Sequence, residues 1–106
     1  MKKITCCNSD RKQNKNFVQV SKFLNIISET NRLQILCVLR SGEKCVCDIY
    51  EALGISQNLV SHHLKKLKEA EIVDSRRDGR KIIYCTNKKV ISEYIDILNN
   101  FLTKNV

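Results

Sequence analysis

The sequence lacks a long apolar run. None of its hydrophobic stretches approaches the roughly 18 to 20 residues that a membrane-spanning helix requires, and the start MKKITCCNSD has no apolar segment of the kind found in signal peptides. These two absences argue against a membrane protein and against export. We therefore expect a cytoplasmic protein that does not contact a membrane.

The sequence also lacks the common signatures of catalysis. It has no glycine-rich phosphate loop and no paired catalytic carboxylates. A cysteine nucleophile would need a histidine partner, but the two histidines, His62 and His63, are adjacent in a helical stretch whose exposed face accounts for both. The sequence therefore predicts a protein that is not an enzyme.

Acidic residues are scarce relative to basic ones. Nineteen lysines and arginines against eleven aspartates and glutamates leave a formal net charge of +8 over 106 residues. A charge of this sign favours an anionic partner, and nucleic acid fits better than a membrane surface. A chain of this length forms one domain with a modest core, to whose stability a partner subunit would add substantially.

The stretch 45–72, CVCDIYEALGISQNLVSHHLKKLKEAEI, predicts two short helices separated by a tight turn. Gly54 is placed to end the first helix, and Ser56 is placed to cap the second. In the second helix the inward positions are Val60, Leu64 and Leu67, and the outward ones are Asn58, Ser61, His62 and Lys65. This pattern indicates a helix-turn-helix with Ser56 to Glu71 as the recognition helix, although an ordinary amphipathic pair is the alternative.

The next segment, IVDSRRDGRKIIYCT, contains two β-prone runs around Asp78-Gly79, a dipeptide typical of tight hairpins. The cations clustered at its tip are Arg76, Arg77, Arg80 and Lys81. A basic hairpin behind a recognition helix is a wing, and its natural role is to hold backbone phosphates. The alternative is a solvated charged hairpin.

The flanking helices carry more apolar surface than one small core can cover. Residues 17–28 have two apolar stripes, and residues 88–103 have two more. This width implies a homodimer packed through both terminal helices, with two recognition helices presented to successive major grooves. Between them, residues 31–40 are apolar nearly all round and are expected in the centre of the core, with Cys37 buried there.

Residues 1–16 are polar and lack periodicity, which predicts a flexible arm before a domain at residues 17–106. The arm contains Cys6 and Cys7. Without an export signal, the six cysteines of the chain are expected to stay reduced and to serve as ligands, redox sensors or core residues. Cys85, on the second wing strand, is expected to be packed.

Cys45 and Cys47 lie at the head of the helix-turn-helix. If Cys45 is near the N-cap, with non-helical dihedral angles, the two thiols can converge in the first turn. The helix dipole, the free backbone N–H groups and Lys44 would favour the thiolate form, which binds soft metals.

Two thiolates alone make a weak site, which Cys6 and Cys7 can complete. The stretch 8–16 extends by up to about 30 Å, enough to reach Cys45 and Cys47 of its own subunit or of the partner. Four thiolates suit Cd(II), Pb(II) or Zn(II), and three suit Pb(II), Bi(III) or As(III). A site that includes histidine is not expected, because both histidines belong to the recognition helix.

Residues 17–102 resemble the ArsR/SmtB winged-helix metalloregulators, repressors that leave their operators when metal binds. The resemblance rests on NRLQIL, CVCDI, SQNLVSHHLKKLKEAEIV and the DGRKIIY wing. It implies double-stranded operator DNA as partner and a metal ion as inducer, not needed for DNA binding. It makes Cys45 and Cys47 metal ligands. It implies that the operator-facing residues of the recognition helix are Gln57, Asn58, Ser61 and His62. It implies that the wing contacts are Arg77, Arg80 and Lys81. To these DNA-binding residues we add Ser56 and Lys65 of the recognition helix.

Departures from the family pattern reduce the set of metal ions that the chain is expected to sense. Arsenic sensors often have a third cysteine where this chain has Tyr50. The pair Cys6-Cys7 is similar to the arm that cadmium and lead sensors bring to the partner's Cys-x-Cys. The family's zinc and nickel sites use Asp and His pairs on the last helix, which are missing here. We therefore expect Cd or Pb as inducer, with As(III) or Zn as further candidates.

The alternative function is a thiol-based redox or persulfide-sensing repressor of the same fold. Persulfide sensors pair a cysteine matching Cys37 with one on the last helix, and this chain has no cysteine there. A metal-buffering protein would explain the thiols but not a wing behind a recognition helix. The sequence leaves the operator, the physiological metal and the regulated genes open.

Overall fold

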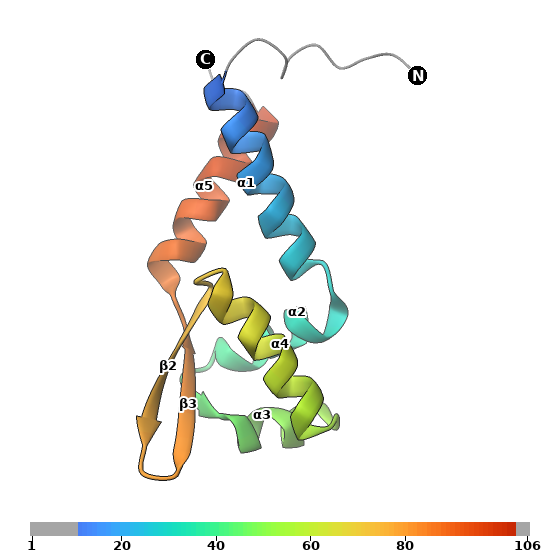
Figure 1. The fold of residues 1–106 in the computed structure, drawn as a ribbon, viewed down its shortest axis with the longest axis vertical. Helices are drawn as coiled ribbons and strands as arrows, with labels where there is room; N and C mark the ends of the chain where they lie inside the picture. The colour runs from blue at the N-terminus through green and yellow to red at the C-terminus, as the bar shows by residue number, and fades with distance from the viewer. Residues whose placement is uncertain (1–10, 104–106) are drawn as a thin grey trace.

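A computed structural model describes residues 11 to 103. Within these residues, five helices accompany one small three-stranded antiparallel sheet (Figure 1). The helices are α1 (Arg11–Ile27), α2 (Thr30–Leu39), α3 (Val46–Leu53), α4 (Gln57–Glu69) and α5 (Lys88–Thr103), and the strands are β1 (Lys44–Cys45), β2 (Val73–Asp78) and β3 (Lys81–Thr86). The chain is mainly α-helical with a winged helix-turn-helix arrangement, as the sequence predicted.

The core lies where α2, α3 and α4 meet the base of the sheet. Its fully buried side chains are Ile35 and Leu39 of α2, Ile49 of α3, Val60, Leu64 and Leu67 of α4, and Ile72 and Val73 at the start of β2. The three α4 residues lie on one face of the helix, as their spacing predicted. Burying each such side chain contributes about 1.5 to 3 kcal/mol, so the core holds α4 firmly against α2 and α3.

Two local signals shape the turn between α3 and α4, both as predicted. Gly54 has a φ of 66°, and its N–H donates to the Tyr50 carbonyl at 2.9 Å, which ends α3. Ser56 caps α4, where its Oγ accepts the Leu59 N–H at 3.2 Å. The helix is shorter than the predicted 56–71, because the chain turns at Glu71, whose φ is 63°.

The sheet has the strand order β1-β3-β2. Strands β2 and β3 form the predicted hairpin, in which Asp78 pairs with Lys81 around a two-residue loop. Gly79 is the first residue of this loop. Its φ of 63° is a left-handed value that glycine adopts readily in tight hairpin turns. Strand β1 adds to the other side of β3. The sequence did not indicate β1, because two residues are too few for an alternating pattern.

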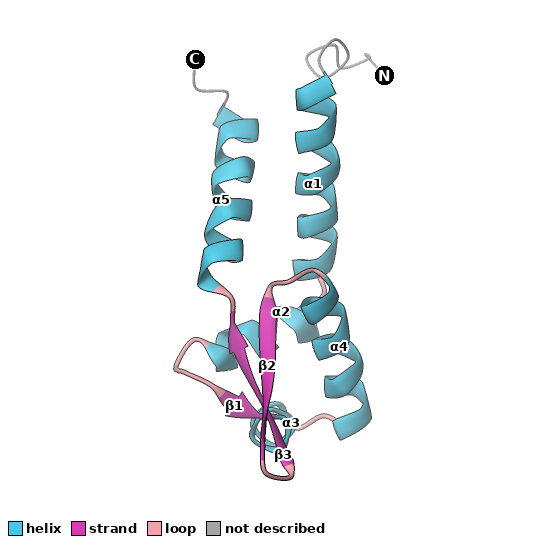
Figure 2. Ribbon diagram, turned by 60° about the vertical axis from the view of Figure 1, so that its left-hand side comes forward, coloured by secondary structure: helices cyan, strands magenta, loops and turns pink. Residues whose placement is uncertain are grey.

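Helices α1 and α5 pack side by side and extend away from the core (Figures 1 and 2). The rings of Phe23 and Tyr94 stack with centroids 4.6 Å apart, and those of Phe17 and Phe101 meet edge to face at 5.9 Å. Helix α5 has the predicted bounds. Helix α1 begins at Arg11, so residues 11–16 are helical where an arm was expected. The rest of that arm, with Cys6 and Cys7, lies outside the described residues.

Two expectations about burial are wrong. Cys37 is exposed and Leu33 is 52% exposed, because only one side of α2 faces the core. His63 is only 6% exposed, although the sequence placed both histidines on the outer face of the recognition helix. Its side chain faces the start of α2. No helix in the described range is long and apolar enough to cross a membrane.

Candidate functional site

The outer face of α4 carries a continuous set of polar side chains. The residues predicted to face DNA are all exposed, namely Gln57, Asn58, Ser61, His62 and Lys65, together with the capping Ser56. Amide side chains can form paired hydrogen bonds with adenine in the major groove, and hydroxyl groups can contact several bases. Because the opposite face of α4 is anchored in the core, this polar face has a defined orientation.

The wing tip carries three exposed cations, Arg77, Arg80 and Lys81. The tip lies at the end of the molecule opposite to the N-terminal end of α1 (Figure 1). Exposed cations on a projecting hairpin are suited to phosphate contacts. The predicted wing residues are therefore all accessible.

Arg76 differs from the other wing cations. Its Nη2 donates to Oε1 of Glu43 at 2.9 Å, and its Nε donates to Oε2 at 3.2 Å. The hydrogen bonds and the opposite charges lower the pKa of the Glu43 carboxyl and raise the pKa of the Arg76 guanidinium. The sequence grouped Arg76 with the basic tip, whereas the structure pairs it with a residue before β1.

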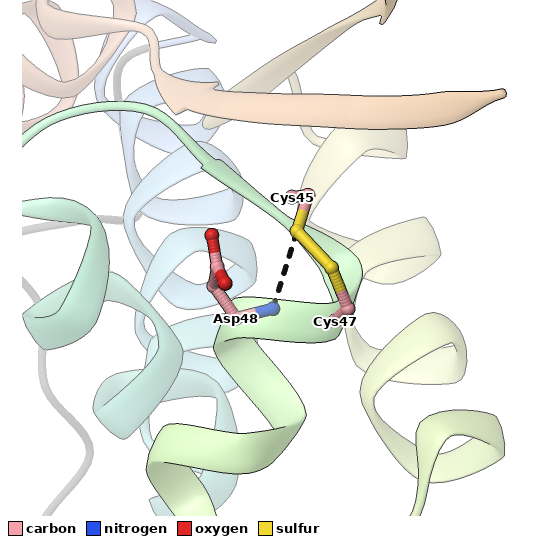
Figure 3. A group of neighbouring side chains, drawn as sticks. All are labelled: Cys45, Cys47 and Asp48. Atoms are coloured by element: carbon pink, nitrogen blue, oxygen red, sulfur yellow. Dashed lines mark hydrogen bonds between the residues drawn. A yellow bond between two sulfur atoms is a disulfide. The ribbon is translucent and has the colours of Figure 1, made fainter. Parts of the chain in front are cut away.

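Cys45 is the N-cap of α3 (Figure 3). Its backbone is extended, with φ −77° and ψ 162°, and its Sγ accepts the N–H of Asp48 at 3.3 Å. This conformation turns the side chain toward Cys47, as predicted, and the two Cα atoms are 5.3 Å apart. The sulfur atoms are joined in a disulfide. The sequence predicted reduced thiols here, whereas the structure shows this pair oxidised; its Cα separation lies within the range that a disulfide can span.

The donor atoms around this pair fit a thiophilic metal once the disulfide is reduced. The sulfur atoms of Cys45 and Cys47 and a carboxylate oxygen of Asp48 all lie within 4.8 Å of one another. Cys45 is 4% exposed, whereas Asp48 is open to solvent. Thiolates suit soft cations, and a donor set of this size leaves coordination positions to be filled from elsewhere. Asp48 was not among the predicted ligands, although it directly follows Cys47 in the sequence.

The remaining cysteines do not join this group within the described residues. Cys37 lies exposed on α2, and Cys85 is partly buried on β3. Cys6 and Cys7, the other predicted ligands, lie outside the described residues.

Helices α1 and α5 leave large apolar side chains uncovered in a single chain. Val18 and Leu102 are more than half exposed, and no residue of α5 is buried. Ile95 is likewise 51% exposed. A surface of this kind is suited to contact with another subunit.

A recognition helix anchored on a helix-turn-helix and followed by a basic wing defines a winged helix-turn-helix DNA-binding domain. Residues 29–75 match the family described as bacterial regulatory protein, arsR family. The chain belongs to this ArsR family.

Individual relatives resemble the chain over most of its length. The arsenical resistance operon repressor of Staphylococcus aureus is 39% identical over 89 residues, which cover 84% of this chain and 86% of that protein. The cadmium resistance transcriptional regulatory protein CadC of Listeria innocua is 34% identical and covers 92% of this chain and 89% of its own. The homodimeric winged helix-turn-helix DNA-binding domain of a Mycobacterium bovis protein is 29% identical, with a TM-score of 0.69 over 89% of this chain and 87% of that one.

Proposed function

We propose that the chain is a transcriptional repressor that binds operator DNA as a homodimer and is released by soft thiophilic metal ions. The observation that carries this function is the position of Cys45, which caps α3, belongs to β1 and converges with Cys47. A change at this thiol pair acts both on the helix that supports α4 and on the strand beside the wing. The similarity to the arsenical and cadmium resistance regulators supports the proposal.

DNA binding uses two surfaces with different roles. The outer face of α4, made of Ser56, Gln57, Asn58, Ser61, His62 and Lys65, contacts base edges in the major groove. The wing cations Arg77, Arg80 and Lys81 hold backbone phosphates and position the helix. Pairing two chains through the exposed apolar side chains of α1 and α5 places two recognition helices on successive half-sites.

The inducer site is built on the reduced form of Cys45 and Cys47. Two thiolates with the neighbouring Asp48 carboxylate favour Cd(II) or Pb(II), with As(III) and Zn(II) as further candidates. Repression itself needs no metal in this proposal, because none of the residues assigned to the two DNA-binding surfaces belongs to the thiol site.

Cys6 and Cys7 complete the site, and the course of α1 favours delivery to the partner subunit. The N-terminal end of α1 lies far from α3 (Figure 2). The 17 residues of α1 span about 25 Å. Only residues 8–10 separate Cys7 from Arg11, and three residues extend by about 10 Å. An arm that starts at the far end of α1 is too short to return to Cys45 of its own chain.

Release from DNA follows from linkage. The thiolate site must bind metal more tightly in the DNA-free conformation than in the DNA-bound one, and the ratio of the two affinities sets the loss of DNA affinity. A tenfold loss requires only about 1.4 kcal/mol. A modest shift of α3 and β1 is therefore enough.

The test compares a Cys45→Ser/Cys47→Ser double variant with a matched Cys37→Ser/Cys85→Ser control. Operator affinity is measured by fluorescence anisotropy on the protein's own upstream DNA, in reducing buffer with and without Cd(II). Wild type and control should lose about tenfold or more in affinity and gain the ultraviolet sulfur-to-cadmium band. The double variant should bind DNA normally and show neither response. Release of the double variant by Cd(II) would contradict the proposal.

The disulfide between Cys45 and Cys47 favours a second candidate, a thiol-based redox repressor of the same fold. As its two thiols form the disulfide, they would give two electrons and two protons to a peroxide. Hydrogen peroxide would be reduced to two molecules of water, and an organic hydroperoxide to an alcohol and water. Release of the wild type by hydrogen peroxide but not by Cd(II) would replace metal sensing with this function.

A further inference from the structure

Glu43 and Arg76 form an ion pair across the wing sheet. Glu43 immediately precedes β1, Arg76 lies on β2, and β3 runs between these two strands. The guanidinium donates two hydrogen bonds to the carboxylate, at 2.9 and 3.2 Å. Because neighbouring strands lie about 4.8 Å apart, the two side chains together reach over the whole width of the sheet.

Arg76 also lies in the same row of the sheet as Cys45. Cys45 is paired with Ile83 on β3, and Ile83 is paired with Arg76 on β2. Directly paired residues of antiparallel strands point to the same face. The thiol residue and the cation of the ion pair are therefore connected through a single residue of β3.

The backbone alone joins β1 to the wing weakly. Strand β1 pairs with β3 at two positions, Lys44 with Tyr84 and Cys45 with Ile83, whereas β2 and β3 pair at six. The Glu43–Arg76 pair adds a direct connection from the segment that carries Cys45 to β2. Both side chains are about half exposed, so such a pair adds little to stability. Its position between two functional segments indicates a different role.

We propose that the Glu43–Arg76 pair couples the thiol site to the wing. Displacement of the segment 43–47 when Cys45 and Cys47 bind metal is transmitted through the pair to β2. It then shifts Arg77, the next residue along β2, away from its phosphate. Arg76 thus acts as a positioning residue and not as a DNA contact. This inference rests on the proposed function and adds to it the route by which metal binding reaches the DNA surface.

The first experiment uses Glu43→Gln and Arg76→Gln, with Glu51→Gln as control. Glu51 is exposed on α3 and has no ion pair within residues 11–103. Both test variants should titrate with Cd(II) like wild type and bind metal-free operator within about twofold of it. The Cd(II)-induced loss of operator affinity should shrink by about threefold or more, and the control should keep the full loss. The charge-exchanged variant Glu43→Arg/Arg76→Glu should recover coupling lost in the single variants.

The second experiment does not use DNA. Backbone amide NMR signals of Arg77 and Lys81 should shift when Cd(II) binds wild type, and should stay unchanged in Glu43→Gln at full Cd(II) occupancy. The proposed coupling would be overturned if Cd(II) released both single variants fully from the operator. It would also be overturned if the amide signals of Arg77 and Lys81 shifted equally in wild type and in Glu43→Gln. A weakening of metal-free DNA binding by Arg76→Gln as large as that by Arg77→Gln would overturn it as well. A wild type that binds Cd(II) with these wing shifts yet keeps its operator affinity would overturn the proposed function and leave the proposed coupling standing.

Discussion

His63 Nε2 on the recognition helix lies 3.6 Å from the Glu29 carboxylate at the junction between α1 and α2. Glu29 also caps α2, because its side chain accepts the Arg32 N–H at 3.0 Å. One carboxylate therefore contacts both α4 and the start of the helix that supports it. Both ring nitrogens of His63 are buried without a hydrogen-bond partner in the described part of the chain. Burial lowers the pKa of His63, an effect that the nearby Glu29 charge opposes.

This lowered pKa predicts a stability that decreases with acidification. Unfolded His63 takes up a proton near pH 6.5, whereas the folded imidazole does so only at lower pH. Below about pH 6.5 the unfolded state binds more protons, so the free energy of unfolding falls until the folded His63 also protonates. His63→Gln should flatten this slope and His62→Gln should keep it, as measured by urea unfolding between about pH 5 and 7.5. An unchanged slope in His63→Gln would contradict the assignment.

The two DNA-binding surfaces should respond differently to substitution. Arg77→Ala or Arg80→Ala should weaken binding to operator and random DNA alike and reduce the salt dependence, since each removes a phosphate contact. Asn58→Ala or Ser61→Ala should mainly reduce the preference for operator, by about 1 to 3 kcal/mol if each contacts a base edge. Anisotropy titrations at several salt concentrations separate the two effects. Equal losses on both DNAs in all four variants would argue against the division.

The apolar surface of α5 predicts how the dimer can be separated without unfolding the chain. Ile95 and Leu102 are 51% and 69% exposed in one chain, so a charge there costs little within the subunit. Ile95→Glu/Leu102→Glu should sediment as a folded monomer at micromolar concentration and lose operator affinity. Asn100→Glu, at an exposed polar position on the opposite side of the same helix, is the control. A wild-type protein that sediments as a monomer would refute dimerisation through this surface.

Gly54 should be sensitive to substitution for a backbone reason alone. Its φ is 66°, and a Cβ added there would meet no atom within 4 Å. Gly54→Ala should therefore cost about 1 to 2 kcal/mol of stability through the left-handed conformation, without a steric clash. Thermal unfolding measures the loss, and an unchanged melting temperature would show that the α3–α4 turn can relax.

The sequence by itself determined the elements whose signals are local. Gly54, Ser56 and the pair Asp78-Gly79 act through hydrogen bonds and dihedral angles within a few residues, so the turn, the cap and the hairpin could all be predicted. The convergence of Cys45 and Cys47 was predictable for the same reason. Long amphipathic patterns likewise predicted the inward face of α4 and the bounds of α5.

Only the tertiary structure decided which side of each element faces a neighbour. His63 is buried and Cys37 is exposed, whereas the sequence predicted the reverse. Burial at these positions depends on where α2 lies against α4, and a helical pattern does not contain that information. Arg76 pairs with Glu43 across 33 positions of sequence, and β1 exists only because β3 lies beside it. Contacts between distant segments depend on how the whole chain packs, which is why local patterns in the sequence do not reveal them.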